Sequence, residues 1–315
     1  MDGERARVAR LARRFAPAPA GVEVGIGDDA AVLASHAGRA LVWTVDTAVE
    51  GVHFRRAWLT LVDLGWRSFM AAASDLAAMG ATPRGALSSL ILPADLGDDA
   101  LDALAEGQNE AARALGTAVV GGNLARGGEL SITTTLLGEA ERPLCRDGAK
   151  PGDVIALAGA VGLARAGLVA LERGLADDAR VAAAVAAWRR PLARLAEGQV
   201  AAGFARAALD LSDGLALDAS RLADASGVGV ELDLRALLAH APPGLRDACA
   251  ALDLDPLETM LTGGEDYALL VAAPAERVLA PFVVVGRVVE GRGLSTLSPE
   301  GEVRPLRPRG WDHFG

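Results

Sequence analysis

The stretch Asp210-Leu211-Ser212-Asp213-Gly214-Leu215 places two acidic residues and a glycine between an apolar run and a segment with helical spacing. We interpret it as a strand that runs into Asp210, followed by a helix that starts near Leu215, with Ser212 or Asp213 as the N-cap. Helix N-termini also bind phosphate, so capping and ligand binding predict the same residues here. Both roles stay open for this segment.

The same association of acidic and small residues recurs at four other places in the chain. These are Gly25-Ile26-Gly27-Asp28-Asp29, Thr44-Val45-Asp46, Ser74-Asp75 and Gly263-Gly264-Glu265-Asp266-Tyr267. If folding gathers these carboxylates in one pocket, their mutual repulsion is unfavourable unless cations lie among them. Mg²⁺ prefers oxygen ligands and is usually held by a few carboxylates together with substrate phosphates. The pattern predicts a metal-dependent enzyme that handles phosphoryl groups.

Each of these segments also has a purely structural interpretation. Residues 25–29 have the composition of a surface turn, because glycine and aspartate dominate turns. Asp75 lies in an apolar, alanine-rich stretch, where an unpartnered carboxylate would cost several kcal/mol, so it must be capped, paired or metal-bound. His53 is the best-placed histidine for a substrate contact, but an isolated histidine or tyrosine more often serves packing.

Composition limits the class of protein. The 315 residues are enough for two modest domains, and an apolar fraction of 51% indicates a globular chain. A net charge of -10 argues against non-specific nucleic-acid binding, and no apolar run reaches the roughly 18 residues that cross a bilayer. Cys145 and Cys249 are far apart in sequence, which suits a reducing compartment. We expect a cytoplasmic protein that binds neither nucleic acid nor membrane.

The use of lysine excludes two common nucleotide-binding scaffolds. Lys150 is the only lysine, so 30 of the 31 basic residues are arginine. No Gly-x-x-x-x-Gly-Lys-Ser/Thr string exists, and the protein-kinase motif set is missing. If the chain uses a nucleoside triphosphate, it does so on another scaffold.

Apolar periodicity predicts strands and helices on both sides of a turn-rich segment at 146–153. We expect strands at 41–45, ending at Asp46, at 85–92, at 117–120, running into Gly121-Gly122-Asn123, at 130–137, at 154–157, before Asp210, at 228–232 and at 267–272. We expect helices within 1–20 and at 59–79, 98–115, 161–173, 193–202 and 215–225. The mixture indicates an α/β or α+β protein with a domain boundary near residue 146.

Seven strings, in this order along nearly the whole chain, resemble those of the thiamine-monophosphate kinase family. They are residues 25–32 (GIGDDAAV), 45–54 (VDTAVEGVHF), 74–81 (SDLAAMGA), 146–153 (RDGAKPGD), 210–215 (DLSDGL), 263–267 (GGEDY) and 310–314 (GWDHF). Each string is moderately specific by itself, and their common order makes the match strong.

The resemblance implies ATP-dependent phosphorylation of thiamine monophosphate to thiamine diphosphate. It also implies an aminoimidazole-ribonucleotide-synthetase-like α/β (α+β) fold with two domains. Residues 1–145 would form an N-terminal domain with the metal and ATP site, whose sheet pairs across a homodimer. Residues 146–315 would complete the ATP and substrate site.

The same resemblance implies a set of site residues. Several Mg²⁺ ions would be held by Asp28, Asp29, Thr44, Val45, Asp46, Asp75, Asn123, Asp210 and Asp213. ATP, the co-substrate, would contact Gly121, Gly122, Asn123, Arg146 and Ser212, and thiamine monophosphate would contact His53, Glu265 and Trp311. The indole of Trp311 suits the thiazolium cation, since an indole face attracts cations by roughly 0.5–2 kcal/mol.

Two positions depart from the family pattern. Asn123 stands where the family usually has aspartate, and Val45 stands where it often has a hydroxyl residue. Asn123 keeps one oxygen ligand without a negative charge, and Val45 can offer only its backbone carbonyl. Because both changes would fall near one expected metal, we expect weaker occupancy of that site.

The implied reaction needs no enzymatic nucleophile. The acceptor is a phosphate oxygen that is already ionised, so in-line positioning and charge neutralisation are the main requirements. We therefore expect direct transfer, with no catalytic residue beyond the metal ligands. Two alternatives remain: another ATP-using synthetase of the same superfamily, or a non-catalytic paralogue that binds nucleotide or thiamine phosphates.

Overall fold

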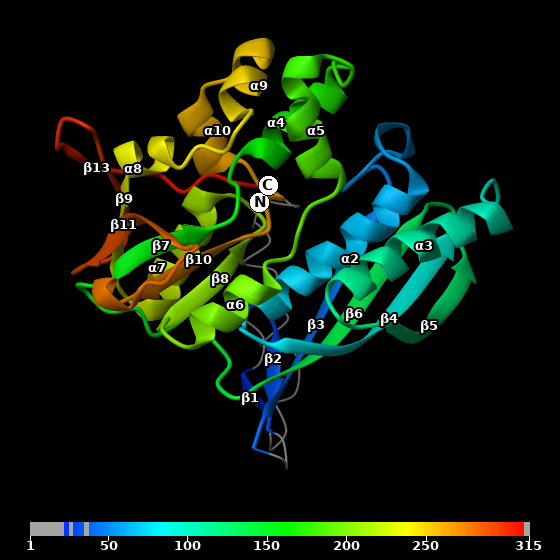
Figure 1. The fold of residues 1–315 in the computed structure, drawn as a ribbon, viewed down its shortest axis with the longest axis horizontal. Coiled ribbons are helices and arrows are strands. Elements are labelled where there is room, and N and C mark those ends of the chain that lie inside the picture. The colour runs from blue at the N-terminus through cyan, green and yellow to red at the C-terminus, as the bar shows by residue number, and fades with distance from the viewer. Residues whose placement is uncertain (1–21, 25–27, 35–37, 312–315) are drawn as a thin grey trace.

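The computed structural model describes residues 22–24, 28–34 and 38–311. The helix expected within residues 1–20 and the glycines at positions 25 and 27 lie outside these ranges. The described residues form two β-sheets with helices between and around them (Figure 1). The mixed α+β fold expected from the sequence is confirmed.

The N-terminal sheet has six strands in the order β1-β2-β3-β6-β4-β5. All neighbouring strands are antiparallel except β4 and β5. Its strands are β1 (Val22–Val24), β2 (Ala31–Leu33), β3 (Ala40–Val49), β4 (Thr82–Leu92), β5 (Val119–Arg126) and β6 (Ser131–Ala140). The helices α2 (Leu61–Ala78) and α3 (Asp98–Ala114) accompany this sheet (Figure 1).

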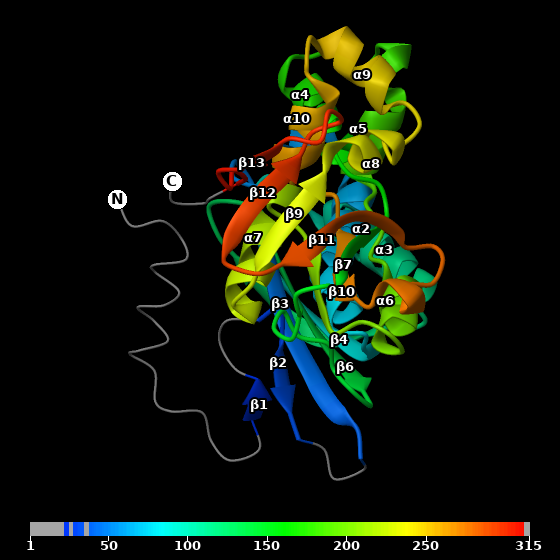
Figure 2. The ribbon, with the colours of Figure 1, turned by 90° about the vertical axis from the view of Figure 1, so that its left-hand side faces the viewer.

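The C-terminal sheet has seven strands in the order β13-β12-β9-β11-β7-β10-β8. Its strands are β7 (Val154–Ala158), β8 (Ala207–Leu211), β9 (Gly229–Asp233), β10 (Ala268–Ala273), β11 (Val283–Val289), β12 (Gly293–Leu297) and β13 (Val303–Pro305). Its helices are α4 (Leu163–Glu172), α5 (Ala182–Arg189), α6 (Leu195–Ala202), α7 (Leu215–Ser226), α8 (Leu234–Ala239), α9 (Leu245–Leu252) and α10 (Pro256–Thr262). Figure 2 shows α4, α5, α9 and α10 gathered at one end of the molecule, opposite β1 and β2.

Helix α2 is shared by the two halves of the molecule. The Thr60 hydroxyl caps it by accepting a hydrogen bond from the backbone N–H of Asp63. Most of its side chains are buried, and they contribute to clusters that also contain residues of β6, β7 and β10. A helix that is apolar on nearly all sides must be covered on nearly all sides. The pattern explains why α2 packs against both sheets.

Two glycines bring α2 and α3 into close contact. A methyl group added at Gly107 of α3 would overlap the carbonyl oxygen of Val62 in α2, and one at Gly65 would overlap the carbonyl oxygen of Leu104. The two helix backbones can therefore touch because neither glycine carries a side chain. The contact fixes α2, and with it Asp75, relative to the N-terminal sheet.

One face of the N-terminal sheet presents exposed apolar side chains. Alternate residues of β6 are buried, and the others are partly exposed. Val45 and Leu87 pair directly with one of the partly exposed residues, so all of these side chains lie on the same face of the sheet. Val45 is 61% exposed and Leu87 46% exposed, with Trp43 and Ile91 on the same face. An exposed apolar patch of this kind indicates an interaction surface.

The predicted helices at 59–79, 98–115, 161–173, 193–202 and 215–225 correspond to α2, α3, α4, α6 and α7. Two predictions about strand ends were wrong. Asp46 lies within β3, which continues to Val49 because β6 pairs with it along that whole length. Gly121-Gly122-Asn123 lies inside β5, because these glycines let β5 pair closely with β4.

None of the helices within the described ranges has both the length and the apolar character needed to cross a membrane.

We predict that Gly107→Ala lowers the free energy of unfolding by about 1–3 kcal/mol, the usual cost of overpacking. The added methyl would push α3 away from α2. Chemical unfolding monitored by circular dichroism measures the change. Gly128→Ala is the matched control, since nothing lies within 4 Å of its added methyl group. Equal effects of the two substitutions would contradict the close helix contact.

Candidate active site

Three carboxylates from distant parts of the chain meet at one point. Asp29 precedes β2, Asp75 lies in the last turns of α2, and Asp210 lies in β8. One oxygen from each lies within 4.8 Å of the other two. Such a set of hard oxygen donors fits a divalent cation such as Mg²⁺, which uses carboxylates as ligands. The convergence expected for these three residues is therefore present in the fold.

The cluster is electrostatically unfavourable when no cation neutralises it. Burial raises the pKa of Asp75 well above the usual value, and the charges of Asp210 and Asp29 raise it further. Burial likewise raises the pKa of Asp210, with Asp29 again adding to the effect. Raised carboxyl pKa values mean that the folded protein resists the ionised form of this cluster. A divalent cation would relieve this cost by favouring the ionised form.

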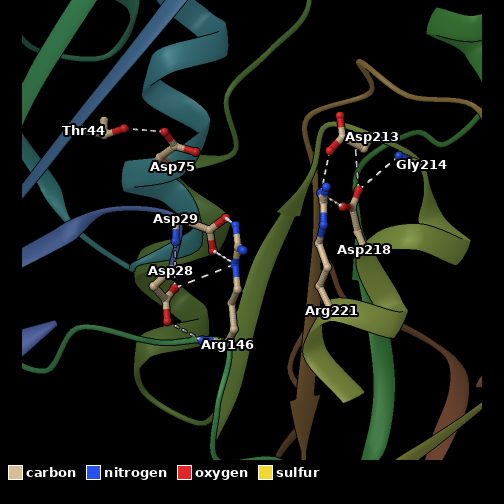
Figure 3. A network of polar contacts seen from close by, with 9 residues as sticks. All are labelled: Asp28, Asp29, Thr44, Asp75, Arg146, Asp213, Gly214, Asp218 and Arg221. Atoms are coloured by element: carbon tan, nitrogen blue, oxygen red, sulfur yellow. Dashed lines mark hydrogen bonds and ion pairs between the residues drawn. The ribbon is translucent and has the colours of Figure 1, made fainter. Parts of the chain in front are cut away.

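Two neighbours organise the carboxylates (Figure 3). The Thr44 hydroxyl donates a hydrogen bond to Asp75. Arg146 donates two hydrogen bonds to Asp29, from Nη2 at 2.5 Å and from Nε at 3.2 Å, and its backbone N–H donates to Asp28 at 3.1 Å. Arg146 follows the end of β6 in sequence, so it ties the connection between the two sheets to the acidic turn. Thr44 and Arg146, which the family resemblance placed at the site, thus contact carboxylates of the cluster.

The loop around Asp213 has its own supporting residues. Arg221 bridges Asp213 at 2.5 Å and Asp218 at 2.7 Å (Figure 3). Asp218 accepts hydrogen bonds from the backbone N–H groups of Asp213 and Gly214, both at 3.1 Å. Burial raises the pKa of Asp218 to about 7, although Arg221 opposes the shift.

The prediction of an N-cap at Ser212 or Asp213 was wrong. Gly214 occupies the N-cap position of α7, with φ of 124°, a conformation that favours glycine. The carboxylate of Asp218 takes over the capping role from within the helix. Ser212 and Asp213 are consequently available to line the adjoining cavity.

A cavity of about 550 Å³ adjoins the carboxylate cluster. Its lining includes the three residues expected to contact the substrate, His53, Glu265 and Trp311, together with six expected around metal and nucleotide, Val45, Asp46, Asp75, Asp210, Ser212 and Asp213. The remaining lining residues are Val52, Trp58, Ala71, Arg165, Leu168, Glu172, Glu258, Thr262, Gly264, Tyr267, Arg309 and Gly310. Segments from both halves of the chain therefore share one concave site.

Backbone hydrogen bonds fix the wall of this cavity. The N–H of Glu265 donates to Ser212 O at 2.7 Å, and the N–H of Trp311 donates to Asp213 O at 2.9 Å. Glu265 has a positive φ of 64°, an uncommon conformation for a residue with a side chain. His53 accepts a hydrogen bond at Nδ1 from the Val49 N–H at 3.0 Å. The GGEDY loop (263–267) and Trp311 are thus both hydrogen-bonded to the backbone of the DLSDG segment (210–214).

The structure does not bring every predicted site residue to this cluster. β5, which holds Gly121, Gly122 and Asn123, is separated from β3 by β6 and β4. Three strand spacings amount to roughly 14 Å. Cross-strand pairing also places Asn123 and Val45 on the sheet face opposite Asp46. Val45 nevertheless lines the cavity beside Asp46, whereas Asn123 lies away from both within a single chain.

Several residues of the site went unnoticed in the sequence. Asp218 and Arg221 lie on α7, Arg67 on α2 and Trp188 on α5, where each has the spacing of an ordinary helix residue. Arg67 and Trp188 contact Glu265, and Trp58 lines the cavity. The one signal available from the sequence was Arg67, an arginine within an apolar helical segment. Arginine is almost never fully buried unless it is paired, so a partner for Arg67 could have been expected.

Comparison with known families defines the class of protein. The N-terminal domain of AIR synthase related proteins matches residues 27–140, and the C-terminal domain matches residues 150–297. The chain is therefore an AIR synthase related protein with both of these domains.

Full-length relatives narrow the assignment. A thiamine-monophosphate kinase from Aquifex aeolicus is 35% identical, covering 92% of both chains, and one from Mycobacterium tuberculosis is 36% identical, covering 99% of this chain and 92% of the relative. A solved structure described as AaThiL complexed with AMPPCP and TMP superposes with a TM-score of 0.90 at 33% identity, covering 99% of this chain and 97% of the other. The chain belongs to the thiamine-monophosphate kinase family.

We predict that Asp210→Asn raises the melting temperature of the metal-free protein at pH 8. The pKa of Asp210 is raised in the folded state, so the stability linked to its protonation is fully present below about pH 4 and is lost as the pH rises through the raised pKa. Asparagine does not ionise, so the variant avoids this loss of stability at high pH. Melting curves of both proteins recorded between pH 5 and pH 8 measure the difference in melting temperature.

In the unsubstituted protein, we expect Mg²⁺ at about 100 times its dissociation constant to stabilise the fold by about 2.7 kcal/mol, or about 5 °C for a chain of this size. Asp210→Asn should remove most of that increase, while Asp102→Asn on the exposed surface of α3 should leave it intact. An Asp210→Asn protein that is less stable without metal and still gains the full increase would contradict the assignment.

Proposed function

We propose that this protein transfers the terminal phosphoryl group of ATP to thiamine monophosphate, giving thiamine diphosphate and ADP. The observation that carries the proposal is the position of the three-carboxylate cluster beside a cavity lined by His53, Glu265 and Trp311. The relatives named as thiamine-monophosphate kinases support it. A similar solved structure, described as a complex with AMPPCP, an ATP analogue, and TMP, supports it further.

Charge is the main obstacle to this reaction. A phosphate monoester carries about -1.5 to -2 charges near neutral pH, and ATP carries more. Each pair of unit charges at 4 Å repels by about 1 kcal/mol in water and by several times that in a protein site. Mg²⁺ bound among the carboxylates would neutralise phosphate oxygens and reduce this repulsion. The protein itself must hold the two phosphates in line.

Mg²⁺ would be bound by Asp29, Asp75 and Asp210, with Asp28, Thr44, Asp46 and Asp213 as further ligands. Arg146 is directed at Asp29 and carries a positive charge that suits an ATP phosphate. Arg146 and the backbone near Ser212 therefore supply the nucleotide contacts that this chain itself brings to the cluster. Since the acceptor oxygen is already ionised, no side chain has to remove a proton from it.

The thiamine end would lie against the far wall of the cavity. Trp311 is 50% exposed, so its indole is accessible to a ligand. An accessible indole face attracts a thiazolium cation. His53 and Glu265 supply polar contacts to the pyrimidine on the same wall. Residues 1–145 would supply most metal ligands, and residues 146–315 would supply most of this wall.

We further propose that the enzyme is a cytoplasmic homodimer. The exposed apolar face around Trp43, Val45 and Leu87 supports a partner at the N-terminal sheet. In such a dimer the strand β5, with Gly121, Gly122 and Asn123, would lie close to the partner chain. This arrangement offers a physical reason for site-type residues on a strand that lies at one edge of the sheet.

The direct test combines purified protein, ATP, Mg²⁺ and thiamine monophosphate, followed by separation of the products by chromatography. We expect thiamine diphosphate and ADP in equal amounts, and a loss of about 100-fold or more in kcat/KM for Asp75→Asn, a typical cost of removing an electrostatic group from a site. ATP turnover that ignores thiamine monophosphate would indicate a different synthetase. Binding without turnover would indicate a non-catalytic paralogue.

The dimer is tested by sedimentation. We expect a mass about twice the 32.2 kDa of the chain, and we expect Leu87→Asp to shift the protein to the monomer because it places a charge in the apolar face. Leu279→Asp, at a site that is 55% exposed outside this sheet, is the control. A monomeric unsubstituted protein at micromolar concentration would refute the dimer.

A further inference from the structure

Glu265 is held by a three-residue network that spans both halves of the molecule. Arg67 of α2 donates one hydrogen bond to Glu265 Oε1 and another to the backbone oxygen of Trp188. The Trp188 indole donates from Nε1 to the other oxygen, Oε2, at 2.7 Å. The Arg67 guanidinium also lies over the Trp188 ring, 4.2 Å from its centroid. Both carboxylate oxygens of Glu265 are therefore fixed.

The network leaves Glu265 with little freedom. The Arg67 side chain is only 6% exposed and that of Glu265 is 26% exposed, so the ion pair lies behind the cavity wall. The backbone of Glu265 is held as well, through its hydrogen bond to Ser212 O. Buried charge-assisted hydrogen bonds of this kind are short and directional. Glu265 consequently presents one fixed edge to the cavity.

Arg67 also changes what Glu265 can recognise. The positive charge of Arg67 offsets the negative charge of the Glu265 carboxylate, so the pair attracts a cation only weakly. A carboxylate has about four lone-pair positions, and the network uses one on each oxygen. The remaining lone pairs accept hydrogen bonds. The wall at Glu265 therefore favours a ligand that presents an N–H donor and disfavours one that presents an oxygen acceptor.

We propose that Arg67 and Trp188 are positioning residues that make Glu265 selective for the amino group of the substrate pyrimidine. The inference rests on the proposed function for the identity of the ligand. In this arrangement the indole of Trp311 meets the cationic ring, and the fixed edge of Glu265 meets the neutral amino group. The selectivity of the site comes from residues that do not themselves touch the ligand.

The test compares two ligands by calorimetric titration: thiamine monophosphate and an analogue with an oxo group in place of the pyrimidine amino group. We expect the unsubstituted protein to bind the amino compound more tightly. The ratio to be compared is the dissociation constant of the oxo analogue divided by that of thiamine monophosphate. Arg67→Met should reduce this ratio at least tenfold, because Glu265 is no longer held. Trp188→Phe keeps the ring beneath Arg67 and should give a smaller reduction in the same direction.

Arg190→Met is the matched control. Arg190 lies over Trp66, 4.3 Å from the ring centroid, and pairs with Glu110 at 2.6 Å, so it joins the same two halves without contacting Glu265. The control should keep the ratio within twofold of the original. If Arg67→Met fails to fold, Trp188→Phe and Arg67→Lys provide the comparison.

Two outcomes would overturn the inference: an unchanged ratio in the folded variants, or an equal weakening of both ligands, which a merely structural role would produce. Product formation from ATP is measured separately. Binding with the expected selectivity but without phosphorylation would refute the proposed function and leave the role of Arg67 supported.

Discussion

The mutual repulsion of Asp29, Asp75 and Asp210 is the constraint on which the rest of the molecule depends. Folding brings one oxygen from each within 4.8 Å of the other two, and burial makes the ionised forms of Asp75 and Asp210 still less favourable. Such an arrangement lowers the stability of the protein without a cation. In the proposed function the cluster lies where the two phosphates would meet, and a cation bound there would reduce their repulsion.

The helix α2 is the element that makes the cluster possible. It packs against both sheets, so Asp75 on its last turns can meet Asp29 from one half and Asp210 from the other. The same helix carries Arg67, which reaches the opposite wall of the cavity to hold Glu265. One helix thus positions both the carboxylate cluster and Glu265, and glycine contacts with α3 keep that helix in place.

Much of this arrangement could be predicted from local sequence, and the remainder could not for physical reasons. Apolar runs next to Asp210 and helical spacing around Asp75 predicted the elements that carry them. The extent of β3 beyond Asp46 depends on its pairing with β6, and the extension of β5 through Gly122 depends on the approach of β4, because a side chain there would overlap the Ser88 carbonyl. Such pairings are properties of the folded chain.

The supporting residues were the least predictable. Asp218 and Arg67 occupy ordinary helical positions, and their roles arise from contacts with Asp213 and Glu265, which lie on other segments of the fold. The short helices α5, α8, α9 and α10 lack long periodic patterns, and the strands β11 to β13 were not predicted either. Family strings predicted that three of the carboxylates would converge, while the structure revealed which residues hold them in place.

The most direct test of the central claim is anomalous diffraction at the manganese edge, from crystals grown with Mn²⁺ and a non-hydrolysable ATP analogue. We predict an anomalous peak within about 2.0–2.5 Å of carboxylate oxygens from Asp29, Asp75 and Asp210, the usual range for metal–oxygen bonds. Manganese bound elsewhere, with these three carboxylates left without a metal, would contradict the account.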